Sequence, residues 1–220
     1  MKYENPVFFI GAQMSEIEFI ENIQKVIQTY FTHGARSSKK VDILHAYFVE
    51  EIKQAIHIHK NPEYSVKCEL DVPSLNASGK KKCDIVVLKN NIPYIVFPVK
   101  FCITNYFQNK NNYWEQLTGE ICHMKWSNPA LHVIPINILL DNTPYLKSSG
   151  TIKKFEKITY ENSLQIYEKL KEQNLVYDNY NVIINVSHQS KVNEKYTDMP
   201  TIHGLSNFKP MQQVLEQILN

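Results

Sequence analysis

The sequence predicts an α/β protein with a mixed central sheet flanked by helices. Helical patterns precede and follow a group of short apolar strands, an order that favours two packed layers. The segment 132–140 is apolar on both faces apart from Asn137, which is typical of a central strand in a parallel arrangement. The chain has 220 residues, of which 43% are hydrophobic and 21% charged, so we expect a single domain over 1–220.

Two helices and three strands are expected in the first half. A capping box at Ser15-Glu16-Ile17-Glu18 predicts a helix that ends near His33-Gly34. Apolar periodicity predicts a second helix over 42–57, and alternation predicts a strand over 64–72. A turn-rich loop at 73–82 leads into two strands, 83–88 and 94–100, joined by a short polar turn.

The second half continues the alternation of helices and strands. A helix over 112–126 is followed by the central strand. Beyond residue 141 we expect a largely helical stretch at 153–173, a strand at 180–186, a polar loop at 187–209 and a closing helix at 210–219.

Composition narrows the class of protein. The net charge of +2 does not by itself indicate a nucleic-acid partner. The four cysteines form no CxxC pair, so a zinc site is not expected and the thiols are read as reduced. No apolar run approaches the length of a membrane span, and the first residues do not resemble a signal peptide. We therefore expect a cytoplasmic protein without a membrane partner.

The most informative pattern is an aspartate and a lysine on neighbouring strands. Asp84 opens the strand that runs to Leu88, and Lys100 closes the strand that begins at Tyr94. In a hairpin these two side chains lie at the same end of the sheet. A carboxylate that holds a cation beside an ammonium group suits metal-assisted attack on a phosphodiester. The alternatives are a solvated aspartate at a strand end and a lysine that extends to solvent.

Basic and amide side chains are clustered around this pattern. One basic run precedes the second helix and another precedes Asp84, positions that favour contact with phosphates, although most such runs are only solvated loops. The polar stretch after Lys100 offers amides that can contact adenine edges, or is a plain hydrophilic loop. The candidate DNA contacts are Arg36, Lys39, Lys40, Lys80, Lys81, Lys82, Asn105, Gln108, Asn109, Lys110 and Asn111.

The segment 42–140 resembles the PD-(D/E)xK nuclease superfamily in its order of elements and in the spacing of Asp84 and Lys100. The resemblance implies a restriction-endonuclease-like core, one or two Mg²⁺ ions, and a lysine that assists the attacking water. It also implies an acid two residues before the lysine, where this chain has Pro98. In one branch of restriction enzymes that acid has moved to the following helix, and Glu115 matches this placement.

Other acids remain candidates for the same site. Glu51 lies on the apolar face of the second helix, where a carboxylate is costly unless it is paired, and the family's first helix often carries an acid. We assign the catalytic role to Asp84, Lys100, Glu115 and Glu51, with Asp84 and Glu115 as the metal ligands. The alternates are Glu50, Glu69 and Glu120.

The expected function is a Mg²⁺-dependent endonuclease acting on double-stranded DNA, of the type II restriction or defence kind. Cleavage of both strands implies a homodimer. Residues 141–220 are expected to serve recognition or dimerisation. Pro98 keeps a second reading open, in which the chain is an inactive nuclease fold that binds nucleic acid. A third reading is a nuclease of the same fold that acts on RNA.

Overall fold

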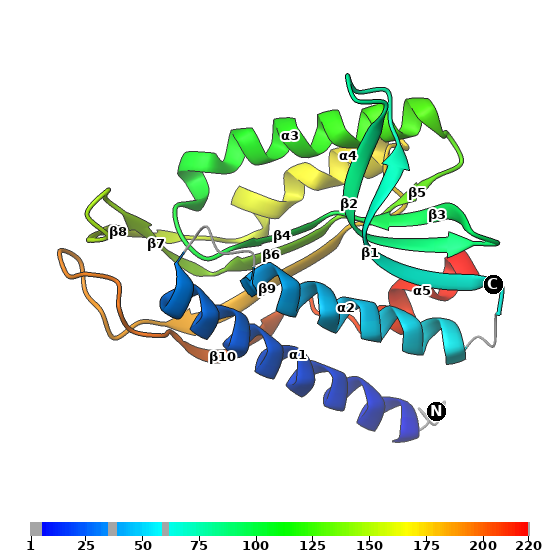
Figure 1. Ribbon diagram of the computed structural model, residues 1–220. Coiled ribbons are helices and arrows are strands. Elements are labelled where there is room, and N and C mark those ends of the chain that lie inside the picture. Colours follow the sequence, from blue (N-terminus) through cyan, green and yellow to red (C-terminus); the bar gives the residue numbers. More distant parts are fainter. Residues whose placement is uncertain (1–5, 35–38, 59–61, 220) are drawn as a thin grey trace.

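The computed structural model describes residues 6–34, 39–58 and 62–219, and it has helices on both faces of a central sheet (Figure 1). The helices are α1 (Pro6–His33), α2 (Lys39–Ile58), α3 (Tyr106–Ser127), α4 (Glu168–Glu172) and α5 (Met211–Leu219). Two short helical turns, η1 (Tyr160–Leu164) and η2 (Gln165–Tyr167), precede α4. The strands are β1 (Tyr64–Pro73), β2 (Lys80–Lys89), β3 (Ile92–Phe97), β4 (Val99–Cys102), β5 (His132–Val133), β6 (Ile136–Leu140), β7 (Asn142–Leu146), β8 (Ile152–Lys157), β9 (Tyr180–Ser187) and β10 (Thr201–Ser206).

Two four-stranded sheets meet in the middle of the molecule. Their orders are β1-β2-β3-β5 and β10-β9-β6-β4. The chain passes from β3 in the first sheet to β4 in the second at Pro98, and from β5 to β6 in the same way at Pro135. At both points the chain therefore continues directly from one sheet into the other. Backbone hydrogen bonds from Ile134 to Val96 and from Ile136 to Pro98 span the junction. The two sheets therefore behave as one twisted layer whose central strands are parallel.

Apolar side chains bury both faces of this layer. On one face, Ile85 and Val87 pack with residues of α1, α2 and α5. On the other face, Val86 and Leu88 pack with residues of α3 and of the segment around α4. The alternation along β2 thus matches the period of two of a strand buried on both sides.

The β1–β2 hairpin bends sharply at Glu69. Its backbone has φ 53, a left-handed conformation that costs a non-glycine residue roughly 1–2 kcal/mol. On one side of the bend, Tyr64 packs with the α2 side of the core, and on the other side Val72 packs with the α3 side. The outer half of the hairpin consequently swings over the end of α3 (Figure 1). Asp84 lies opposite Glu69 at this bend, since Cys68 pairs with Ile85 and Leu70 with Cys83.

The structure departs from several predicted elements. The first helix begins at Pro6, before the capping box, and α3 begins at Tyr106, so the stretch predicted as a polar loop is helical. Prolines divide two predicted strands, because a proline lacks the N–H that a ladder needs. The stretch 153–173, predicted as largely helical, overlaps strand β8, which pairs with β7. The predicted polar loop at 187–209 contains strand β10. In both cases pairing with a neighbouring strand outweighs local propensity.

Two strands beyond residue 140 belong to the same layer as the predicted core, whereas β7 and β8 form a separate two-stranded sheet. Strand β9 pairs with β6 in parallel and β10 pairs with β9 in antiparallel register. Within the described ranges, no helix has both the length and the apolar character that crossing a bilayer requires.

Candidate functional site

Asp84 is held where β3 leaves β2. Phe97 is the last residue of β3 that pairs with β2, and Pro98 interrupts the strand. The backbone N–H of Val99 then donates to Asp84 Oδ2 at 2.7 Å. A side-chain carboxylate therefore replaces the strand partner that the backbone has lost. This bond fixes Asp84 relative to the residue that precedes Lys100.

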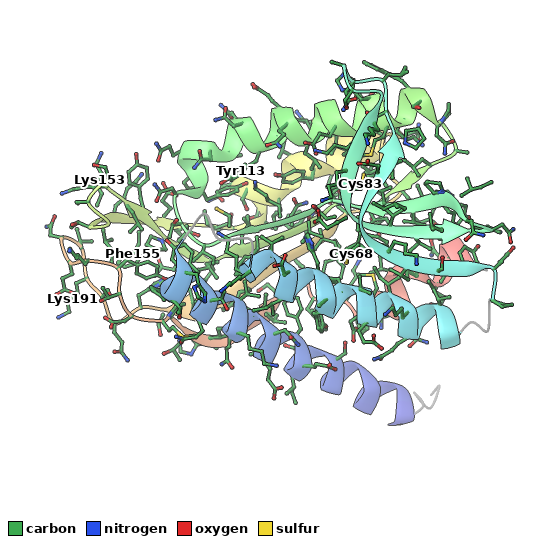
Figure 2. All side chains as sticks on the ribbon, viewed as in Figure 1. Cys68, Cys83, Tyr113, Lys153, Phe155 and Lys191 are labelled. Carbon is green, nitrogen blue, oxygen red and sulfur yellow. The ribbon has the colours of Figure 1, made fainter. Side chains whose placement is uncertain are left out.

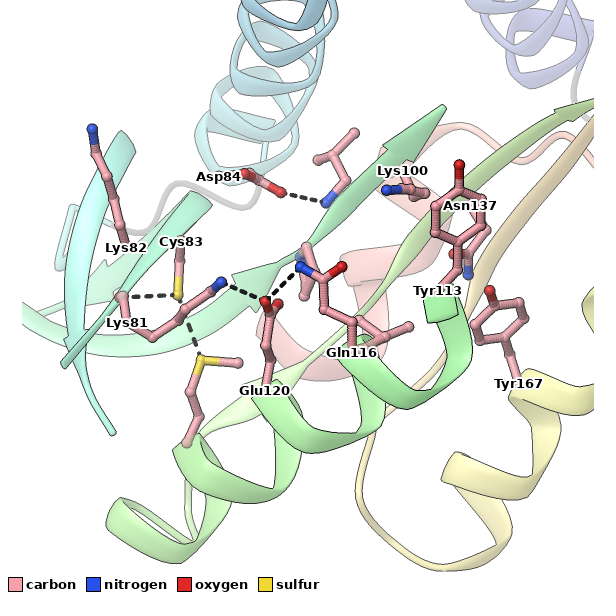
Figure 3. Close-up of a pocket in the computed structure, with 14 residues that line it drawn as sticks. Lys81, Lys82, Cys83, Asp84, Lys100, Tyr113, Gln116, Glu120, Asn137 and Tyr167 are labelled. Atoms are coloured by element: carbon pink, nitrogen blue, oxygen red, sulfur yellow. Dashed lines mark hydrogen bonds and ion pairs between the residues drawn. The ribbon is translucent and has the colours of Figure 1, made fainter. Parts of the chain in front are cut away.

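A cavity of about 230 Å³ lies beside Asp84 and Lys100 (Figure 3). Its walls come from β2, the β3–β4 junction, β6, η2 and α3. Its lining residues are Lys81, Lys82, Cys83, Asp84, Pro98, Val99, Lys100, Tyr113, Gln116, Leu117, Glu120, Met124, Asn137 and Tyr167. The structure thus brings the aspartate and the lysine of the sequence pattern to one pocket.

Lys100 presents an ammonium group that no carboxylate neutralises within the described part of the chain. Its Nζ lies 4.0 Å from the centroid of the Tyr113 ring, close enough for a cation–π interaction. Tyr113 comes from α3 and covers the lysine from that side (Figure 3). The positive charge is therefore available to an anionic group that enters the pocket.

Helix α3 contributes Glu120 to the pocket, whereas Glu115 is exposed and does not line it. The two glutamates are about 1.4 turns apart and point in different directions. Glu120 Oε1 lies 2.5 Å from Lys81 Nζ and accepts from Gln116 Nε2 at 3.1 Å. Of these two α3 glutamates, the pocket is therefore lined by Glu120, which was the alternate candidate. The charge of Glu120 is paired with that of Lys81.

A second group of ligand atoms surrounds Asp84 on the side of α2. His45, Glu69 and Asp84 each offer an atom, and these atoms lie within 4.8 Å of one another. His45 Nδ1 is 3.5 Å from Glu69 Oε1, and His45 Nε2 is 3.9 Å from Asp84 Oδ1. The bend at Glu69 is what turns the hairpin so that this carboxylate meets the histidine of α2.

His45 was not selected from the sequence. Its side chain is only 4% exposed, and Nε2 makes no hydrogen bond to any described residue. Burying a polar atom without a partner costs roughly 1–3 kcal/mol. The available signal was a histidine on the apolar face of α2, next to Leu44 and one turn before Phe48, but its partners come from a hairpin whose bend the sequence does not reveal.

The donor set suits a divalent cation. One imidazole nitrogen and two carboxylates are ligands for Mn²⁺ and related metals, while Mg²⁺ favours oxygen ligands alone. The unpartnered, buried Nε2 of His45 is the observation that fits such an ion, since coordination would satisfy it. Burial raises the pKa of Asp84, while the Val99 N–H and His45 act in the opposite direction. A neighbouring cation would favour the ionised form of this carboxyl.

Glu51 and Glu50 lie away from the pocket. Glu51 accepts a 3.1 Å hydrogen bond from Ser15 of α1, and burial raises its pKa. Its place on the apolar face is explained by this contact between α1 and α2. Glu50 is exposed and lies 3.7 Å from Lys53.

The predicted phosphate contacts have varied surroundings. Lys80 pairs with Asp71 at 2.6 Å, and Lys82 pairs with Glu69 at 3.1 Å. Lys39 and Lys40 begin α2, and Lys40 Nζ lies over the Tyr30 ring at 5.6 Å. Desolvation lowers the pKa of Lys40, and repulsion from Lys100 also contributes. Arg36 lies outside the described residues.

The predicted amide contacts serve largely to anchor α3. Asn105 precedes the helix with φ 57, and its Oδ1 accepts from the Leu146 N–H at 2.8 Å. Asn109 donates to the Asn105 carbonyl, and Lys110 donates to the Asn162 carbonyl at 2.6 Å. Gln108 and Asn111 are in the first turns of the same helix. None of these five residues lines the pocket.

No protein-family model matches the chain, and no curated protein matches it either. The function must therefore be argued from the geometry of the site.

Proposed function

We propose that this chain is a divalent-cation-dependent endonuclease that hydrolyses phosphodiester bonds of double-stranded DNA, with a core related to the PD-(D/E)xK superfamily. The observation that carries the proposal is the convergence of Asp84 and Lys100 on one pocket, with His45 and Glu69 grouped around the same aspartate. Two carboxylates, an imidazole and an ammonium group in this arrangement suit the hydrolysis of a phosphate ester.

The roles of the residues follow from their positions. His45, Glu69 and Asp84 would hold the cation, which when bound supplies Lewis-acid activation of the phosphate and of the attacking water. Lys100 would donate hydrogen bonds to the incoming water oxygen and to the phosphate, and so stabilise the negative charge that develops there. The water oxygen forms a bond to phosphorus as the P–O3′ bond breaks, and the proton that the water releases is balanced by the proton that the departing O3′ takes up, which leaves a 5′-phosphate and a 3′-hydroxyl.

Glu120 takes the place that the sequence had given to Glu115. It is the α3 glutamate that lines the pocket, and Figure 3 shows it reaching toward Lys81. We assign it as the acid that replaces the one displaced by Pro98. In this role it must exchange Lys81 for the cation or the water, and Lys81 is then available for a phosphate of the substrate.

One site per chain cuts one strand at a time. A pair of chains related by a two-fold axis would place two sites on the two antiparallel strands, so a homodimer on DNA accompanies this proposal. Sedimentation of the protein with and without a DNA duplex measures the number of chains in the complex.

Cleavage of plasmid DNA tests the proposal. Wild-type protein with Mg²⁺ or Mn²⁺ should nick or linearise plasmid, and Asp84→Asn and Lys100→Ala should each lose this activity. Matched controls are Asp71→Asn and Lys89→Ala, which change the same residue types on the β1–β2 hairpin, outside the pocket. Cleavage by both pocket variants at the wild-type rate would refute the assignment. A parallel assay on RNA separates the two substrates.

The pairing of Glu120 with Lys81, together with Pro98, favours one alternative: a nuclease fold that binds nucleic acid without cutting it. In that case calorimetry would detect no binding of Mn²⁺, and DNA would bind in a manner that weakens with salt.

A further inference from the structure

A row of polar side chains crosses the centre of the sheet. Lys100 of β4 is the register partner of Asn137 of β6, which is in turn the partner of Asn181 of β9. Partners on adjacent parallel strands share one face, about 4.8 Å apart. Asn137 and Asn181 are 3% and 6% exposed, in strands whose other residues are mainly aliphatic. Two buried amides in such strands are costly unless their hydrogen bonds are used.

The hydrogen bonds of this row have a direction. Asn137 Nδ2 donates to Asn181 Oδ1 at 2.9 Å. Burial raises the pKa of the Tyr160 hydroxyl to about 12, while the neighbouring Asn181 side chain acts in the opposite direction, as an amide donor does. Tyr160 Oη in turn donates to Glu168 Oε1 at 2.6 Å. An ionised carboxylate can only accept, so Glu168 sets the direction for the whole row.

The direction leaves an acceptor at the other end. Asn137 lines the pocket together with Lys100, and Figure 3 shows both next to Tyr113. Its Nδ2 is used by Asn181, and no described residue donates to its Oδ1. Asn137 Oδ1 is therefore a hydrogen-bond acceptor without a donor in a pocket that Lys100 also lines, and the Lys100 ammonium carries three N–H donors.

Resting on the proposed nuclease function, we propose that Asn137 is a positioning residue for Lys100. In this role the Lys100 ammonium would donate a hydrogen bond to Asn137 Oδ1, which has no donor among the described residues, and Asn181 would hold the Asn137 amide in the orientation that presents this oxygen. The Tyr113 ring contacts the ammonium, and Asn137 on the neighbouring strand would supply a second contact. Lys100 is thereby kept beside Asp84 rather than extended into solvent.

Substitution of Asn137 by leucine, which has nearly the same shape, distinguishes a positioning role of Asn137 from a purely structural one. Asn137→Leu removes the acceptor and leaves Asn181 unpaired, so it should destabilise the fold. Asn137→Leu with Asn181→Leu removes both amides, and it should recover stability because no buried group lacks a partner. Urea denaturation compares the two variants.

Proton exchange of the Lys100 ammonium is the direct measurement. Spectra of ¹⁵N-labelled lysine ammonium groups, with the Lys100 signal assigned through Lys100→Arg, report how fast its protons exchange with water. Exchange should be several-fold faster in the stable double variant than in the wild type. Equal exchange rates in the two proteins would overturn the proposal.

Cleavage kinetics supply the second readout. The double variant should show a lower kcat with little change in KM, because Lys100 is still present but less often in place. A loss confined to KM would instead make Asn137 a substrate contact and overturn the positioning role. If the wild type cuts no nucleic acid, the proposed function fails, whereas the exchange measurement still decides on Asn137.

Discussion

Asp84 and Val99 are joined by a 2.7 Å hydrogen bond from the Val99 N–H to the Asp84 carboxylate. The bond lies where Pro98 ends the pairing of β3 with β2, so it replaces a rung of the sheet ladder. Since Lys100 follows Val99 directly, the same bond sets the position of the lysine relative to the aspartate. The catalytic pair of the proposed nuclease is therefore built into the junction between the two sheets.

The junction makes Asp84→Asn an informative change. The amide oxygen of asparagine can still accept from the Val99 N–H, so the fold should be retained, while the negative charge is lost. We expect binding of Mn²⁺ to weaken by tenfold or more, roughly the scale seen on disturbing metal sites. Isothermal titration calorimetry measures the binding, and urea denaturation checks the fold. Wild-type affinity for Mn²⁺ in this variant would remove Asp84 from the cation site.

His45→Leu should uncouple stability from the cation. In the cation-free protein, leucine removes a buried Nε2 that makes no hydrogen bond and only long contacts of the ring with Glu69 and Asp84, so stability should change little or rise. In the wild type, a cation at 100 times its Kd adds about 2.7 kcal/mol to the free energy of unfolding, and in the variant it should add far less. Thermal denaturation with and without Mn²⁺ measures both effects. An equal upward shift of Tm in the two proteins would contradict a ligand role for His45.

Sequence reasoning reached the mixed α/β class and placed Asp84 and Lys100 together, because both depend on local signals: apolar strands, a short turn and fixed spacing. It kept Glu69 as an alternate acid for this site, but it did not select His45 and gave no reason for these two residues to meet at Asp84. The contact of His45 and Glu69 with Asp84 depends on the left-handed backbone conformation of Glu69. This conformation is typical of glycine, so a glutamate in the sequence gives no sign of it. Glu115 was preferred for its spacing from Lys100, whereas the structure has Glu115 exposed and Glu120 lining the pocket, a difference in helix face that spacing along the sequence does not reveal.

The two glutamates of α3 form a matched pair for mutation. Glu120→Gln should lower the rate of DNA cleavage by at least about tenfold, because it removes the carboxylate that lines the pocket. Glu115→Gln changes an exposed side chain outside the pocket and should cut at the wild-type rate. Initial rates of plasmid nicking at saturating Mn²⁺ compare them. The reverse order of effects would restore Glu115 to the site and exclude Glu120.

Glu51→Gln gives a pH-dependent change in stability. Burial against α1 raises the pKa of Glu51, and the Ser15 hydrogen bond offsets this only in part. A group with a raised pKa adds stability below its unfolded pKa, and this is lost as the pH rises through the folded pKa. Glutamine keeps an acceptor for Ser15 and cannot ionise. The variant should therefore be more stable than the wild type at neutral pH, with the advantage fading as the pH falls toward and below the ordinary value of 4.5.

Urea denaturation across this pH range measures the effect, and cleavage at neutral pH supplies the control. Glu51 does not line the pocket, so Glu51→Gln should keep wild-type activity. A stability difference that does not vary with pH would mean that Glu51 titrates alike in the folded and unfolded states. Loss of cleavage with stability intact would return Glu51 to the catalytic set.

Pro98→Asp tests whether Glu120 stands in for a displaced acid. Pro98 lines the pocket two residues before Lys100, and its carbonyl accepts from the Ile136 N–H at 2.8 Å, a bond that any residue can make. An aspartate there restores the acid of the family pattern, at a cost in stability of about 0.4–1 kcal/mol from the added freedom of the unfolded chain. In a Glu120→Gln background it should recover part of the lost cleavage. Pro98→Asn carries the same backbone change without the charge, so equal activity of the aspartate and asparagine variants would show that no acid is needed at this point of the pocket.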